Sequence, residues 1–400
     1  MNRGNRFYAL DNLRAVIMWL GVVLHVAVNH LQGESRLPWR DSATTMWADI
    51  IVIWIHVYRM PLFFILAGFF AAMLVSKYGF KYMLKNRFKR IALPFIVFWP
   101  PLFILTSLLV MMFIHLMKTG VIGLDPNLVR DPADDRPILP TMHLWFIYDL
   151  IWLCLLSIPI YWLMGKVGPS IKDKCLAIHK VLATKWWGFL VLSLPLAGIG
   201  AFYHNGLVHP SGSFVPNMGE LGHNGLFFVF GWLFYFHREN LFQHYHAHVW
   251  RYSLAGVVTF FVFLITVRLA KEGVLPTVQA NLTSAYVFNS TTWLWSFAII
   301  GLFLRYLPDH NKFMLYISNS SYWVYLVHML GTIGFGILLY NMDFSAITKM
   351  LINITLTTVF ALATYHWFVR FSFIGKFLNG TKHLRNNIPS AGGKHEATES

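Results

Sequence analysis

The chain alternates long apolar stretches with short charged segments, and this pattern constrains its fold more than any other feature. About ten stretches reach the roughly 20 residues of helix that match the hydrocarbon core of a bilayer. Only 12% of the residues are charged, which is about half of what a soluble domain carries. Because backbone hydrogen bonds must be satisfied internally in lipid, we expect these stretches to be helices. The sequence therefore predicts an all-α, polytopic integral membrane protein with about ten transmembrane helices.

We place these helices by hydropathy, with errors of several residues at each end. The predicted spans are residues 11–31, 47–75, 91–117, 143–164, 187–204, 221–236, 251–269, 285–306, 313–340 and 346–372. They form one domain, residues 1–380. We expect a polar and disordered cytoplasmic tail at residues 381–400. The segment 205–220 is rich in Gly, Pro and His, and we consider it a candidate re-entrant loop.

Most of the 32 Lys and Arg residues lie in the connecting segments on the same side as the N-terminus. The positive-inside rule places that side in the cytoplasm, and an even number of spans places the C-terminus there too. The net charge of +15 does not indicate a nucleic-acid partner, because the basic residues lie between apolar spans rather than on one soluble face. The absence of a Walker motif and of a dinucleotide fingerprint argues against an ATP-driven pump.

The first span carries Asp11, Arg14 and His25, and such residues within lipid are functional candidates because burying them costs several kcal/mol. The eleven-residue step from Arg14 to His25 is about 1100° of helical rotation, so the two side chains lie about 20° apart on one face. They are separated by about 16 Å along the helix axis. The alternative is a helix-packing stripe in which Asp11 and Arg14 form an interfacial ion pair.

The second span carries Arg59 near its middle, where a cation needs a partner or a water-filled cavity. Pro61 predicts a kink, and Gly68 predicts a close approach of another helix. This combination favours an anion-binding cavity. The alternative is that the Arg59 side chain extends outward to the membrane interface.

A basic group precedes the third span, at Lys81, Lys85, Arg87 and Arg90. Clustered cations beside a membrane bind either anionic lipid head groups or a phosphorylated ligand. On the ninth span Ser318, Ser321, Tyr325 and His328 share one face, and interhelical hydrogen bonding is the alternative to a functional stripe. No metal site is expected, because the cluster His244, His246 and His248 has no close carboxylate.

Five motifs, taken together and in order, resemble the membrane-bound acyltransferase 3 family along nearly the whole chain. They are Arg14 with His25 eleven positions on, Phe63-Phe64 with Gly68-Phe69, Arg87 with Arg90, His143-Leu144-Trp145-Phe146, and Ser318 through Tyr322 and Tyr325 to His328. The chain most resembles the glucan biosynthesis branch, which succinylates periplasmic glucans. It departs from many members at Ala67, where they have Ser, and at His366, near which they have Glu.

The resemblance implies a multi-pass protein of the bacterial inner membrane that moves an acyl group from cytoplasmic acyl-CoA to a glycan hydroxyl. His25 is then the general base or a transient acyl carrier, with Arg14 and its neighbour Asp11 on the donor side. The expected substrate-binding residues are Arg59, His143, Trp145, Tyr325 and His328, and the expected CoA-phosphate-binding residues are Lys81, Lys85, Arg87 and Arg90.

The expected partners are membrane lipids, succinyl-CoA or acetyl-CoA as donor, and a glucan or other glycan as acceptor, with no tightly bound cofactor. A transporter of a glycan or a small organic anion is the alternative, since it would also bury Arg and His. The sequence leaves open the acyl group, the acceptor, the oligomeric state, and whether transfer is direct or passes through an acyl-histidine.

Overall fold

The computed structural model describes residues 7–33, 35, 37–128, 139–274, 276–309 and 311–379. Within these ranges all regular structure is helical, which confirms the predicted fold class. The predicted tail at residues 381–400 lies outside the described residues.

Eight helices of the described chain are long and apolar enough to cross a membrane, which confirms a polytopic membrane protein. They are α1 (Tyr8–Val28), α2 (Met46–Tyr78), the continuous helix α3 (Phe80–Arg87), η1 (Phe88–Ala92) and α4 (Leu93–Thr119), η3 (Met142–Leu144) with α5 (Trp145–Lys166), α9 (Arg238–Lys271), α10 (Thr277–Tyr306), α11 (Lys312–Tyr340), and α12 (Ala346–Thr364) with η5 (Tyr365–Val369).

The two remaining predicted spans differ from simple membrane-crossing helices. The fifth corresponds to a broken pair, α6 (Pro169–Thr184) and α7 (Gly188–Gly200), with a bend of 105° between the two helices. The sixth is α8 (Met218–Phe236), which is not among the eight helices that are long and apolar enough to cross a membrane. Length and composition therefore support eight or nine spans of this kind, where the sequence predicted about ten.

The chain is sharply bent between α6 and α7, which the sequence did not predict. Gly188 permits this bend, because a Cβ at that position would overlap the carbonyl oxygen of Leu182. The 205–220 segment, for which a re-entrant course stays a prediction, begins within the short helix η4 (His204–Gly206) and continues as a loop that is tied to the start of α5. There the amide of Thr141 donates a hydrogen bond to the carbonyl oxygen of Gly212 at 2.7 Å.

The helices α2 and α8 pack backbone against backbone, as the sequence predicted at Gly68. A Cβ on Gly68 would overlap the carbonyl oxygen of Phe228, and a Cβ on Gly231 would overlap that of Ile65. Reciprocal glycines of this kind let two helices approach closely in a membrane protein. The helix α2 continues through Pro61 without a break, and Pro61 is buried there. The kink that the sequence predicts at Pro61 stays a prediction.

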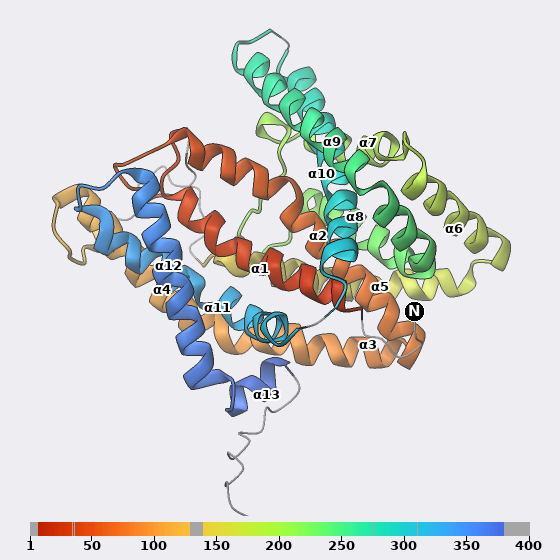
Figure 1. Ribbon diagram of the computed structural model, residues 1–400, viewed down its shortest axis with the longest axis horizontal. Coiled ribbons are helices and arrows are strands. Elements are labelled where there is room, and N and C mark those ends of the chain that lie inside the picture. The colour runs from red at the N-terminus through yellow and green to blue at the C-terminus, as the bar shows by residue number, and fades with distance from the viewer. Residues whose placement is uncertain are drawn as a thin grey trace, which may run out of the picture.

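The first helix lies near the centre of the bundle, in contact with both α2 and α11 (Figure 1). Its polar stripe therefore faces protein rather than lipid. The hairpin of α9 and α10 extends away from this centre, and the short helix α13 (Phe373–Asn379) lies at the edge of the bundle. The centre of the bundle, where α1 meets α2 and α11, is where the candidate site residues gather.

Candidate active site

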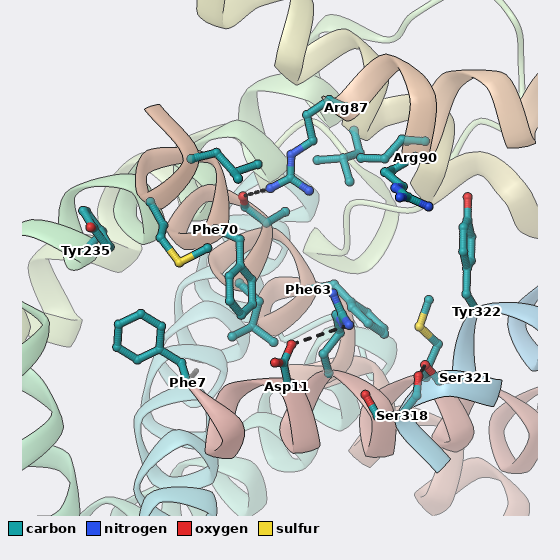
Figure 2. A pocket seen from close by; sticks show the side chains of 18 of the residues that line it. Phe7, Asp11, Phe63, Phe70, Arg87, Arg90, Tyr235, Ser318, Ser321 and Tyr322 are labelled. Atoms are coloured by element: carbon teal, nitrogen blue, oxygen red, sulfur yellow. Dashed lines mark hydrogen bonds and ion pairs between the residues drawn. The ribbon is translucent and has the colours of Figure 1, made fainter. Parts of the chain in front are cut away.

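A cavity of about 1260 Å³ lies between the first half of α1, the second half of α2, and the segment formed by α3 and η1. The helices α5, α9 and α11 add further residues to its wall, and α8 and α13 add one residue each. Five cations line it, which are Arg14, Lys77, Arg87, Arg90 and Arg238. In Figure 2, Arg87 and Arg90 project into the cavity from one wall, and Asp11 projects from α1 on the opposite wall. Only two carboxylates, Asp11 and Glu239, are among the lining residues of this described cavity.

The wall formed by α3 and η1 carries two cations whose partners are backbone carbonyls. Arg87 Nη2 donates to the carbonyl oxygen of Ala67 at 3.4 Å, and Arg87 Nε has no partner. Arg90 Nη1 donates to the carbonyl oxygens of Phe377 at 3.0 Å and Lys376 at 3.4 Å. Because no described carboxylate forms an ion pair with either guanidinium, this wall retains its positive charge and suits an anionic ligand.

The opposite wall carries the predicted pair of Asp11 and Arg14. Arg14 Nη2 lies 3.5 Å from Asp11 Oδ1, and the Asp11 side chain is far more buried than that of Arg14. The guanidinium carbon of Arg14 lies 6.0 Å from the ring centroid of Phe70. The ion pair therefore stands on the cavity wall with Arg14 open to a ligand.

Arg59 lies just beyond the floor of the cavity, which Met18 and Phe63 form. It is only 5% exposed, so the alternative of a side chain reaching the interface is wrong. Its Nε donates to the carbonyl oxygen of Ile17 at 2.9 Å, and its guanidinium carbon lies 5.7 Å from the ring centroid of Phe63. In the described chain Arg59 has no carboxylate partner, so it is a buried positive charge held by neutral groups.

A cluster of three imidazoles lies deeper along α1. His25 from α1, His143 from η3 and His328 from α11 form consecutive ring contacts, with centroid distances of 5.1 Å for His25–His328 and 5.3 Å for His143–His328. Three segments that are far apart in sequence thus bring their histidines together. His25 is two helical turns, or about 10 Å, beyond Met18.

Hydrogen bonds to the backbone fix two of these imidazoles. His143 Nε2 donates to the carbonyl oxygen of Leu326 at 3.1 Å, and the Tyr325 hydroxyl donates to the carbonyl oxygen of His143 at 2.8 Å. His328 Nδ1 donates to the carbonyl oxygen of Tyr325 at 2.8 Å. The other nitrogens, His143 Nδ1 and His328 Nε2, are buried without a partner. The cluster therefore offers two unused acceptors beside His25, which is itself partly exposed.

The predicted stripe on α11 connects the cavity with the histidine cluster. Ser318 and Ser321 line the cavity, whereas Tyr325 and His328 lie farther along the same helix among the imidazoles. The first helix makes the same connection, from Asp11 and Arg14 in the cavity to His25 in the cluster.

Three predicted residues lie apart from both features. Lys81 and Lys85 are exposed on α3 and do not line the cavity. Trp145 is partly buried at the start of α5, where it packs against the main hydrophobic core. It is not among the residues that line the cavity.

Sequence reasoning did not single out Arg238, Tyr235 or Lys77, although all three line the cavity. The Arg238 guanidinium carbon lies 4.6 Å from the ring centroid of Tyr235, a cation–π contact between neighbouring helices. The only signal was position, because each residue lies at the end of a span on the side that the charge pattern assigns to the cytoplasm.

A buried ion pair at the other end of α1 was also missed. Lys349 Nζ lies 3.0 Å from Asp41 Oδ1, and both side chains are almost fully buried. Nearby, His30 Nδ1 donates to the carbonyl oxygen of Ala43 at 2.8 Å. Burial lowers the pKa of His30, and the bond to Ala43 and the charge of Asp41 only partly oppose this effect. The ion pair between Asp41 and Lys349 joins the segment that follows α1 to α12.

The remaining histidines of interest lie outside the site. The ring centroids of His244 and His248 lie 4.4 Å apart with the ring planes tilted by 31°, and His246 is exposed. Over the part of the chain that the structure describes, no three His, Cys, Asp or Glu side chains are grouped as a metal ion would require. His366 is exposed and lies 3.4 Å from Arg370, from Nδ1 to Nη1, so it does not enter the cavity.

The chain is similar to proteins of one known family. A family model described as an acyltransferase domain matches residues 7–366. Proteins named glucans biosynthesis protein C from Salmonella typhi and Salmonella typhimurium are each 25% identical to the chain over 350 residues, which is 83% of this chain and 83% of each relative. The protein of the same name from Salmonella paratyphi B is 24% identical over the same length. No solved structure matches the chain.

Proposed function

The chain belongs to the acyltransferase 3 family, and from that premise we propose that it moves an acyl group from acyl-CoA to a hydroxyl of a glycan. The observation that carries the proposal is that a single helix, α1, connects a cation-lined cavity at Arg14 with an imidazole cluster at His25. Such a helix links a site for an anionic donor to a site for general base chemistry.

The cavity suits the nucleotide part of CoA. Guanidinium groups bind phosphate oxygens through short, charge-assisted hydrogen bonds, and Arg87 and Arg90 have no competing carboxylate among the described residues. Arg14 and Arg238 supply further charge, and the rings of Phe70 and Tyr235 offer apolar surface to the adenine. The positive-inside rule places this end of the bundle in the cytoplasm, where acyl-CoA is made.

The chemistry requires one proton acceptor and one centre of positive charge. His25 takes the proton of the acceptor hydroxyl as its oxygen attacks the thioester carbonyl. Arg59 lies between the cavity and the cluster, where its buried charge stabilises the oxyanion that develops on the carbonyl. The carbon–sulfur bond then breaks, and the thiolate of CoA takes up the proton that His25 holds. In the acyl-histidine variant, His25 receives the acyl group first and the hydroxyl attacks second.

The acceptor is a glycan on the side of the membrane opposite the donor. This part of the proposal rests on the relatives, whose name refers to glucan biosynthesis. We therefore expect the protein in the bacterial inner membrane, with the acceptor in the periplasm and succinyl or acetyl as the acyl group. His143 and Tyr325 lie in the same cluster as His25 and would orient the acceptor hydroxyl.

The test uses the full chain in liposomes, with succinyl-CoA or acetyl-CoA on the cation-rich side and periplasmic glucan on the other. Mass spectrometry of the glucan should detect acyl groups with the wild-type protein and with His246→Ala, a matched control whose imidazole is exposed on α9. His25→Ala should lower the yield by at least about 100-fold. An unchanged yield in correctly inserted His25→Ala would reject the role of His25. Glucan that crosses the membrane unmodified without acyl-CoA would indicate a transporter instead.

A further inference from the structure

His328 is the imidazole that contacts both other members of the cluster, and it is almost completely buried at 1% exposure. Its ring centroid lies 5.1 Å from that of His25, with the ring planes tilted by 47°. Two imidazoles that share an N–H···N hydrogen bond have centroids about 5 Å apart, from the bond length and the ring radii. The two rings are therefore close enough to share such a bond after a rotation of the His25 ring, although none joins them in the structure.

The backbone of α11 fixes the tautomer of His328. Its Nδ1 faces the carbonyl oxygens of Tyr325 at 2.8 Å and Val324 at 3.1 Å. Carbonyl oxygens only accept, so Nδ1 carries the hydrogen, and Nε2 of the neutral ring is a bare acceptor. That Nε2 atom is buried and has no hydrogen-bond partner. An unpaired buried acceptor costs about 1–3 kcal/mol, and an N–H of a neighbouring ring that donates to it would recover this cost.

The charges that face His25 make such an acceptor necessary. Arg59 and His56 from α2, His143 from η3 and His328 from α11 act on it electrostatically. None of these four groups is a carboxylate, and Arg59 carries a permanent positive charge. A proton that arrives on His25 therefore adds a second positive charge, and an uncharged acceptor can stabilise it. Of the two unused acceptors in the cluster, His328 Nε2 belongs to the ring that contacts His25.

We propose that His328 is the positioning partner of His25. When His25 takes the proton of the acceptor hydroxyl, it becomes an imidazolium with two N–H groups. One N–H carries the transferred proton, which later passes to the thiolate of CoA. The other N–H donates a hydrogen bond to His328 Nε2. This bond holds the His25 ring in place, and His328 gains no proton. This inference deepens the proposed function and rests on His25 acting as a base there.

A chemical titration tests the pairing without any donor or acceptor substrate. Diethyl pyrocarbonate modifies neutral imidazole, so its rate at His25, followed by peptide mass spectrometry across pH, reports the titration midpoint of His25. In His328→Phe the hydrogen-bond acceptor is lost, and we expect the midpoint to fall by about one pH unit, since hydrogen bonding to a charged form favours that form. In His328→Gln the side-chain oxygen accepts instead, and we expect most of the shift to be restored.

Equal midpoints in the wild type and in His328→Phe would overturn the proposal. If the Phe variant does not fold, His328→Leu removes the same acceptor with a smaller side chain. Acyl transfer in liposomes provides the second readout: kcat should fall about 100-fold in the Phe variant and recover in the Gln variant, while the donor KM stays unchanged. A midpoint shift without any acyl transfer by the wild type would keep the pairing and reject the proposed function.

Discussion

The guanidinium of Arg59 occupies the space beside Gly21 that the Cβ of any other residue would fill. Its Nε also binds the carbonyl oxygen of Ile17, one turn earlier on α1. A side chain from α2 thus lies directly on the backbone of α1, between the cavity and His25. This contact explains how a charge without a described carboxylate partner stays inside the bundle: the glycine makes room for it, and a backbone carbonyl binds it.

We therefore expect Gly21→Ala to displace Arg59 and to reduce acyl transfer by at least about tenfold. Overpacking a filled interior typically costs about 1–3 kcal/mol, so the unfolding temperature in detergent should also fall. Gly334→Ala is the matched control, because a Cβ on Gly334 in α11 meets no atom within 4 Å. Equal activity and stability in the two variants would contradict the contact between Arg59 and Gly21.

Arg87 and Lys85 provide a comparison of two cations, two residues apart, of which only Arg87 lines the cavity. Loss of a charge-assisted hydrogen bond costs about 1.5–3 kcal/mol, so Arg87→Ala should raise the donor KM by about 10- to 100-fold. Lys85→Ala and Lys81→Ala should leave it within about twofold, since both side chains are exposed outside the cavity. The measurement is initial rate against acyl-CoA concentration. A larger effect of Lys85→Ala than of Arg87→Ala would place the donor on the outer face of α3.

The buried pair of Asp41 and Lys349 predicts an unusual order of stabilities. Removing one partner of a buried ion pair leaves an uncompensated charge and costs about 3–5 kcal/mol. Lys349→Met should therefore be strongly destabilising, whereas the double variant Asp41→Asn with Lys349→Met should be more stable than Lys349→Met alone. Thermal unfolding in detergent measures both. A double variant that is less stable than either single variant would contradict this order. It would mean that the ion pair stabilises the fold by more than the mutual neutralisation of two buried charges.

Burial lowers the pKa of His30, and this predicts how stability depends on pH. In the unfolded chain His30 titrates near its ordinary value, so below about pH 6.5 the unfolded state binds more protons than the folded state. The stability that neutral His30 contributes is complete above that pH and is lost as the pH falls toward the lower folded-state pKa. The unfolding temperature should drop between pH 7.5 and pH 5. His30→Asn, whose amide nitrogen can still donate to Ala43, should show a shallower drop, and an identical slope would reject this role.

The sequence predicted the helical fold and the two stripes well, because both follow from local periodicity. A bilayer-length apolar run and a polar residue every third or fourth position can be read without tertiary contacts. The placement of Asp11, Arg14 and His25 on one face of α1 is of this kind, and the cavity and the imidazole cluster lie along that face.

The sequence did not predict features that depend on how helices far apart in the sequence meet in space. Arg238 enters the cavity because the start of α9 lies beside α2, and Lys349 finds Asp41 across more than three hundred residues. The same limit explains Lys81 and Lys85: their spacing from Arg87 is compatible with one basic group, but the orientation of α3 directs only part of that group into the cavity. The broken pair of α6 and α7 arises at Gly188, where the deciding contact is with a backbone carbonyl rather than with a side chain.

The hydrogen bonds from Arg90 to the carbonyl oxygens of Lys376 and Phe377 connect the cavity wall to α13. Leu378 of the same helix also lines the cavity. During synthesis, the helices that carry Arg14, Arg87 and His25 enter the membrane long before residues 376–378 leave the ribosome. The cavity wall is consequently finished only when the chain has been made through residue 378, so a shorter polypeptide inserts in the membrane with this wall incomplete.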